Sequence, residues 1–113
     1  METTRQNKIS RLLQKELSEI FLLMTKGKMR GTLISVSMVR TSPDLSLAKV
    51  YLSIFPSENA AGILAYIEER KWNIRHDLAA RIRFQLRKVP EIAFFADDSL
   101  DYLQNIDKLL KSS

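Results

Sequence analysis

The stretch LISVSMVRTSPDLSLAKVYLSIF, residues 33–55, contains two segments in which apolar residues alternate with other residues. Alternation with a period of two is typical of strands that bury one face. The Ser-Pro-Asp sequence at 42–44 is typical of a turn. The stretch therefore predicts two strands, residues 33–40 and 47–55, joined as a hairpin. Their buried faces are predicted to consist of Ile34, Val36 and Met38 in the first strand and Ala48, Val50, Leu52 and Ile54 in the second.

A helix is predicted before the hairpin. Thr3 and Gln6 have the Thr-x-x-Gln spacing of a capping box, which satisfies backbone N–H groups at a helix start. Apolar residues then recur every three or four positions, and the helix is expected to end near Gly27. The predicted apolar face consists of Ile9, Leu12, Leu13, Leu17, Ile20, Phe21 and Met24.

Two helices and a third strand are predicted after the hairpin. Ser57 is a plausible N-cap for a short helix that ends at about Arg70. A second helical period follows, and Pro90 ends it because proline restricts the residue before it. Residues 92–96 are short and apolar, as in a strand. The second period consists of Ile74, Leu78, Ala79, Ile82 and Leu86.

A last helix is predicted to start at Asp98 or Ser99, with an apolar set of Leu100, Leu103, Ile106, Leu109 and Leu110. The order helix, strand, strand, helix, helix, strand, helix favours one α+β layer. We therefore expect a single domain over residues 1–113, in which about 98–113 form a C-terminal helical extension.

The composition points to a small protein without disulfides. The chain has 113 residues, a formal charge of +5 and no cysteine. The polar N-terminus argues against a signal peptide, and no apolar run is long enough to span a bilayer. These features favour a cytoplasmic protein.

Charge is unevenly distributed along the chain. Residues 70–88 contain seven Lys or Arg and one Asp, whereas residues 91–107 contain five acidic residues and no basic one. On a helical wheel, His76, Arg83 and Arg87 share a stripe away from the apolar arc. A polarised surface suits a polyanion, and a solvated charged face is the alternative.

No catalytic grouping stands out. His76 is the single histidine, and Asp97-Asp98 is better interpreted as a helix start than as a Mg²⁺ site. The three glycines match neither a P-loop nor a dinucleotide fingerprint. We therefore expect no enzymatic activity, no cofactor and no metal.

Several segments together resemble the ribosome-binding factor A family. They are RQNKI (5–9), VSMVR (36–40), SPDLS (42–46), AKVYLS (48–53), LRKVPEIAF (86–94), Asp98-Ser99 and Ile106-x-x-Leu109. The resemblance implies a type II KH fold, with a mixed three-stranded sheet and helices on one side. It also implies a small-subunit (30S) assembly factor that binds immature 16S ribosomal RNA near its 5′-terminal helix and aids late processing. Such proteins matter most in the cold and are linked indirectly to an assembly GTPase, and we expect a monomer.

The predicted RNA contacts follow the basic residues. One group is central, and a second could extend it from the first helix and the loop after it. The central group is Arg70, Lys71, Trp72, Arg75, Arg83, Arg87 and Lys88; the second is Arg5, Lys8, Arg11, Lys28 and Arg30.

Two of these residues are ambiguous. Trp72 could stack on a base or pack in the core, and packing is favoured. Arg75 falls inside the apolar arc of the wheel, so its stem is expected to be buried and its head exposed.

The junction between the central helices departs from the family pattern. KH domains usually carry Gly-x-x-Gly there, and the resemblance implies an Ala-x-Gly kink instead. This chain has Arg70-Lys71-Trp72, which leaves the geometry of the kink open. The alternative function is a protein-interaction adaptor that uses the acidic face of the last helix.

Overall fold

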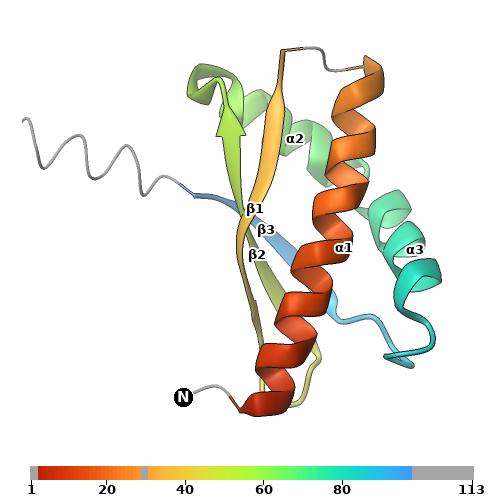
Figure 1. The fold of residues 1–113 in the computed structure, drawn as a ribbon. Helices are drawn as coiled ribbons and strands as arrows, with labels where there is room; N and C mark the ends of the chain where they lie inside the picture. The colour runs from red at the N-terminus through yellow and green to blue at the C-terminus, as the bar shows by residue number, and fades with distance from the viewer. Residues whose placement is uncertain (1–2, 29–30, 98–113) are drawn as a thin grey trace, which may run out of the picture.

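The computed structural model describes residues 3–28 and 31–97 (Figure 1). The helix predicted for the C-terminal extension lies outside these residues. A short 3-10 turn, Ser57–Asn59, follows the second strand. The main elements are α1 (Thr4–Lys28), β1 (Leu33–Thr41), β2 (Leu47–Phe55), α2 (Ala60–Glu69), α3 (Lys71–Ile82) and β3 (Glu91–Ala96).

The three strands form one mixed sheet in the order β1-β2-β3. β1 and β2 are antiparallel, as predicted for the hairpin, and β3 is parallel to β2. The three helices lie on the same side of this sheet (Figure 1). The α-β-β-α-α-β order and the mixed sheet confirm the α+β class and agree with a type II KH fold.

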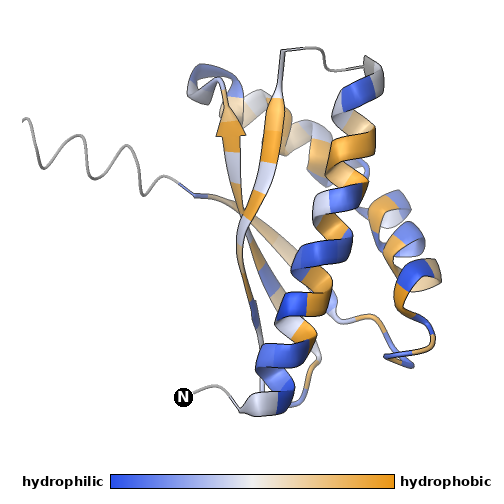
Figure 2. Ribbon diagram, viewed as in Figure 1, coloured by the Kyte–Doolittle hydropathy of each residue, from blue (hydrophilic) through white to orange (hydrophobic). Residues whose placement is uncertain are grey.

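The core lies between the three helices and the covered face of the sheet. Leu13, Leu17 and Phe21 on α1 are fully buried. The Phe21 ring meets the Phe94 ring of β3 edge to face, with centroids 6.0 Å apart, an arrangement that aromatic pairs prefer. Hydrophilic and hydrophobic residues alternate along α1 (Figure 2), as expected for a helix with one buried side.

The N-terminus of α1 is fixed by polar groups. The Thr3 N–H donates to Gln6 Oε1 at 2.8 Å, and the Gln6 N–H donates to Thr3 Oγ1 at 3.2 Å, which confirms the capping box. Gln6 Nε2 also donates to the Thr41 carbonyl at 2.9 Å, and both residues are buried. Because unpaired buried polar groups are costly, these bonds hold the start of α1 against the end of β1.

The prediction that Met38 belongs to the buried face is wrong. The register shifts between Val36, which pairs with Leu52, and Met38, which pairs with Tyr51. Ser37 is therefore the extra residue of a β-bulge, and it reverses the alternation beyond it. Val39 is buried and Met38 is exposed. In β2, which has no bulge, all four predicted core residues are buried.

Two helix boundaries also differ from prediction. Ser57 begins the 3-10 turn, and Asn59 precedes α2 without a side-chain cap. α3 ends at Ile82 rather than continuing past Leu86. A helix advances only about 1.5 Å per residue, less than half the rise of extended chain. The connection 83–90 is therefore largely non-helical, since it has to return to the sheet edge where the Glu91 N–H donates to the Ser46 carbonyl.

The bulge predicts an unusual tolerance to deletion. Removing Ser37 leaves Val36 facing the core and Met38 facing outward, so the residues that remain alternate without interruption. We expect this variant to keep the near-UV circular dichroism of the native protein. The matched control removes Ser53 from β2, which moves Ile54 off the core face and should greatly lower the melting temperature. If the two deletions lower the melting temperature equally, Ser37 is not the extra residue of a bulge.

Candidate nucleic-acid interface

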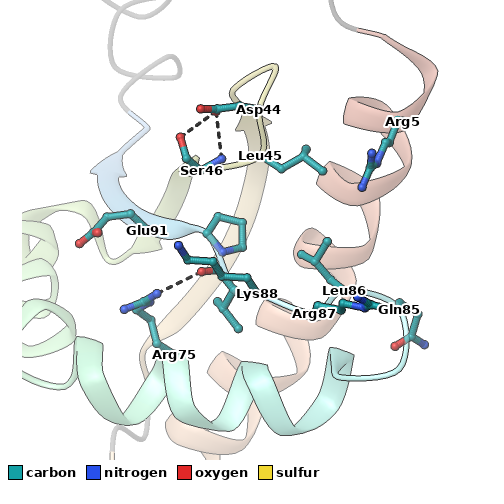
Figure 3. A pocket seen from close by; sticks show the side chains of 12 residues that line it. Arg5, Asp44, Leu45, Ser46, Arg75, Gln85, Leu86, Arg87, Lys88 and Glu91 are labelled. Atoms are coloured by element: carbon teal, nitrogen blue, oxygen red, sulfur yellow. Dashed lines mark hydrogen bonds between the residues drawn. The ribbon is translucent and has the colours of Figure 1, made fainter.

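A cleft of about 660 Å³ opens where three distant parts of the chain meet (Figure 3). The first turn of α1, the β1–β2 turn and the connection 83–90 line it. We call it the basic cleft, because four basic and two acidic residues face it. Its lining residues are Arg5, Asp44, Leu45, Ser46, Arg75, Gln85, Leu86, Arg87, Lys88, Val89, Pro90 and Glu91.

Four of the predicted contacts therefore come together in this cleft. Arg5 is provided by α1, Arg75 by α3, and Arg87 and Lys88 by the connection. Arg87 and Lys88 are exposed. The predicted helical stripe of His76, Arg83 and Arg87 is wrong, because α3 ends before the two arginines. The connection rather than a helix face places Arg87 in the cleft.

Arg75 forms a wall of the cleft. Its Nη2 donates to the Val89 carbonyl at 3.1 Å, so it ties the connection to α3 (Figure 3). Its Nε is buried and has no hydrogen-bond partner among the described residues. The stem is buried as expected, but the guanidinium is partly buried as well. Arg75 thus contributes positive charge to the cleft while holding its shape.

The β1–β2 turn is fixed by a hydrogen-bonded carboxylate. The Ser46 hydroxyl donates to Asp44 Oδ1 at 2.7 Å and the Ser42 hydroxyl at 2.8 Å. These bonds, with the Ser46 backbone N–H, lower the pKa of Asp44 to about 2. Asp44 is therefore ionised at neutral pH. The turn also holds Leu45 at a φ of 60°, a conformation that few non-glycine residues adopt.

The interpretation that Trp72 packs in the core is wrong. The side chain is 72% exposed, because the buried stripe of α3 consists of Ile74, Leu78 and Ile82. The Trp72 ring stacks on His76 with centroids 5.1 Å apart and planes 9° apart. His76 is exposed as well.

The Trp72–His76 stack adjoins the basic cleft. A hollow of about 180 Å³ lies beside the two rings, and Arg75 and Val89 line both the hollow and the cleft. Positive charge and exposed aromatic rings therefore lie on one continuous surface. This is the combination that binds single-stranded nucleic acid, through phosphate contacts and base stacking.

Sequence reasoning missed Phe84. Its ring is 85% exposed, and the Arg83 guanidinium lies 4.7 Å from its centroid. Arg83 is thus beside an exposed ring rather than inside the cleft. The signal was available, because Phe84 falls outside the apolar arc of its segment and stands between Arg83 and Gln85.

The other predicted contacts lie outside the cleft lining. Lys71 pairs with Glu68 at 3.2 Å and Arg70 with Glu69 at 3.7 Å, and Arg70 also covers the Tyr66 ring at 3.6 Å. Partly exposed pairs of this kind contribute little stability, so a phosphate could replace the acid.

Of the α1 candidates, Lys8 and Arg11 are exposed but do not line the cleft. The side chains of Lys28 and Arg30 lie outside the described residues. Arg81 is committed elsewhere, because its Nη1 lies 2.7 Å from Glu19 Oε2 and 3.3 Å from Glu16 Oε2.

The junction between α2 and α3 consists of Arg70 alone. Its φ of −105° and ψ of 14° are accessible to any L-residue, so the kink needs no glycine. The Arg70 N–H donates to the Ile67 carbonyl, and the Ile74 N–H donates to the Arg70 carbonyl. The backbone bonds thus continue across the kink.

Within 3–28 and 31–97, no cluster of three His, Cys, Asp or Glu side chains could hold a metal ion. Over the same ranges, no helix is both long and apolar enough to cross a membrane.

Comparison with known proteins identifies relatives over almost the whole chain. The family described as ribosome-binding factor A matches residues 5–110. Ribosome-binding factor A of Christiangramia forsetii is 49% identical over 111 residues, which cover 97% of this chain and 85% of that protein. The Chlorobaculum tepidum protein is 39% identical over 109 residues, covering 96% and 89%.

Solved structures agree with this relationship. The crystal structure of ribosome-binding factor A from Thermus thermophilus superposes with a TM-score of 0.65, covering 80% of this chain and 94% of that one; at 24% identity it supports the fold. Coordinates of the Thermus thermophilus protein fitted into a cryo-EM map of a 30S complex give a TM-score of 0.64 at 27% identity, covering 79% and 91%. The chain belongs to the ribosome-binding factor A family.

Proposed function

We propose that the protein is a non-enzymatic assembly factor of the small ribosomal subunit, which binds immature 16S ribosomal RNA through the basic cleft and the aromatic residues beside it. The observation that carries this proposal is the continuity of the cleft with the Trp72–His76 stack. Family membership supports it, as does the 30S complex into which the Thermus thermophilus relative was fitted.

The cleft and the rings would have different tasks. Arg5, Arg87 and Lys88 neutralise phosphates, which positions the protein but carries little sequence information. Trp72 and Phe84 stack on unpaired bases, an interaction that every base can make. Specificity then depends on the shape of the RNA and on the surrounding ribosomal surface.

The finer assignments form part of the same proposal. The RNA site lies near the 5′-terminal helix of 16S RNA, and binding aids late processing of the precursor, with the greatest effect in the cold. The protein acts in the cytoplasm as a monomer, and an assembly GTPase is its indirect partner. These assignments rest on the family resemblance, and the cleft supplies the charge that they require.

Cosedimentation tests the proposal directly. We expect the protein to sediment with free small subunits and not with whole ribosomes. An Arg87→Ala/Lys88→Ala variant should leave the small-subunit fraction at salt concentrations where the native protein remains bound. Binding to neither particle, or equal binding of the variant, would contradict the proposal.

The salt dependence of RNA binding gives a quantitative prediction. Each phosphate contact that is lost makes the slope of log K against log salt less negative by about 1. The Arg87→Ala/Lys88→Ala variant should therefore have a slope that is less negative by about 2. Both residues are exposed, so the melting temperature should not change. The measurement is fluorescence anisotropy with a single-stranded RNA between about 50 and about 200 mM salt.

The matched control for that variant is Arg40→Ala/Lys49→Ala. It removes the same charge from the face of the sheet opposite the helices. We expect its salt slope to remain native. An equal fall in both variants would mean that net charge, and not the cleft, governs binding.

Trp72→Ala separates stacking from packing. Because Trp72 is 72% exposed, we expect an unchanged melting temperature. Loss of one stacked base costs about 1–3 kcal/mol, which lowers RNA affinity by roughly 5- to 150-fold. Trp72→Phe keeps an aromatic face and should retain most of the affinity. Native affinity in Trp72→Ala would remove Trp72 from the interface.

A further inference from the structure

The face of the sheet opposite the helices has two rows of apolar side chains, most of them exposed. Met38, Tyr51 and Phe95 stand directly opposite one another across the three strands. The rings of Tyr51 and Phe95 stack at 5.4 Å. Farther along the sheet, Leu33 is paired with Phe55, and these side chains are 55% and 66% exposed. Contiguous apolar patches of this kind usually mark an interaction site.

A row of small side chains separates the two apolar rows, and we call this row the trough. Ser35 is paired with Ser53 between them, and both side chains are small. Tyr51 and Phe55 are four residues apart on β2, which separates the rows by about 13 Å. An α-helix with its side chains is about 10–12 Å across. A helix that lies across the strands over the trough therefore meets apolar side chains on both sides.

Positive charge lies next to the trough. Arg40 and Lys49 are directly opposite each other in the next row, beyond Met38 and Tyr51. Like charges in this position repel. Neither residue forms an ion pair with any residue in 3–28 or 31–97. The occupant of the trough should therefore have an apolar face and no net positive charge.

The chain leaves the sheet at the end of this trough. β3 is an edge strand, and its last residue, Ala96, is paired with Leu52. The Asp97 N–H then donates to the Leu52 carbonyl at 2.6 Å. Ser53, on the floor of the trough, is the next residue of β2. Whatever follows Asp97 therefore starts beside the serine pair.

The sequence after Asp97 has the required character. At 100° per residue, Leu100, Leu103 and Ile106 fall on one half of a helical wheel, together with Leu109 and Leu110. Residues 99–110 contain Asp101, Asp107 and Lys108, so their net charge is slightly negative. Twelve helical residues span about 18 Å, and the three strands span about 10 Å. A helix over 99–110 is thus long enough to cross the sheet.

We propose that residues 99–110 form a helix that docks in this trough, with Leu103 over Ser53 and Ile106 over Ser35. The flanking rows hold its apolar face. Attachment to β3 without a spacer gives this segment a millimolar effective concentration at the trough. RNA has no apolar face to cover the two rows. A second copy of the chain has no covalent link to this β3 and so lacks the high effective concentration.

Cysteine cross-linking of the full chain tests the proposal. The chain has no cysteine, so Ser53→Cys/Leu103→Cys introduces a single reactive pair. The matched control is Ser53→Cys/Asn105→Cys, because residue 105 falls on the opposite side of the helical wheel. We expect mild oxidation to form an intramolecular disulfide at least tenfold faster in the Leu103 pair, measured by mass spectrometry and non-reducing electrophoresis.

Each other outcome overturns the proposal. Equal rates in the two pairs would mean that the segment does not dock on one face. Cross-linked dimers without an intramolecular product would assign the trough to a second copy. If the Leu103 pair forms its disulfide no faster than the Asn105 pair, and Arg40→Ala/Lys49→Ala loses RNA affinity, the trough is assigned to RNA. Near-UV circular dichroism confirms that each variant is folded before oxidation.

Discussion

The packing of α1 against one face of the sheet is the contact on which the other features depend. It buries Leu13, Leu17 and Phe21 and brings the aromatic ring of β3 into the same core. The Gln6–Thr41 hydrogen bond sets where α1 begins along β1, and the pairs from Arg81 to Glu16 and Glu19 fix α3 to α1. Because α1, α2 and α3 lie on one face, they leave the other face of the sheet uncovered.

The basic cleft is a consequence of this arrangement. Its walls come from the start of α1, the β1–β2 turn and the connection after α3, which meet only once the sheet has formed. The Asp44 carboxylate fixes one wall, and the Arg75–Val89 bond fixes another. A wall held by hydrogen bonds loses less conformational freedom on binding, so more of the interaction energy appears as affinity.

Local patterns were predictable where local physics decides the structure. The capping box and the alternation of β2 depend on neighbouring residues, and both were predicted correctly. The bulge at Ser37 depends on the partner strand, so β1 alone could not indicate that Met38 faces outward. The early end of α3 depends on the distance back to β3, which no helical wheel contains. The site was predicted in part for the same reason. Clustered basic residues indicated a polyanion-binding surface, but not which of them are already paired with acids, as Arg81 is. The large side chain of Trp72 favours burial in the core, but its exposure depends on which side of α3 it occupies.

The kink at Arg70 has a consequence for the unfolded chain. A glycine at a helix junction gives the unfolded chain extra conformations that folding has to remove, at a cost of about 0.4–1 kcal/mol relative to a compatible non-glycine residue. Arg70 has a negative φ, so its side chain adds no backbone strain. Because there is no glycine between Arg70 and Trp72, the unfolded chain has fewer backbone conformations at this junction. For the same reason, the backbone has less freedom to change the angle between α2 and α3.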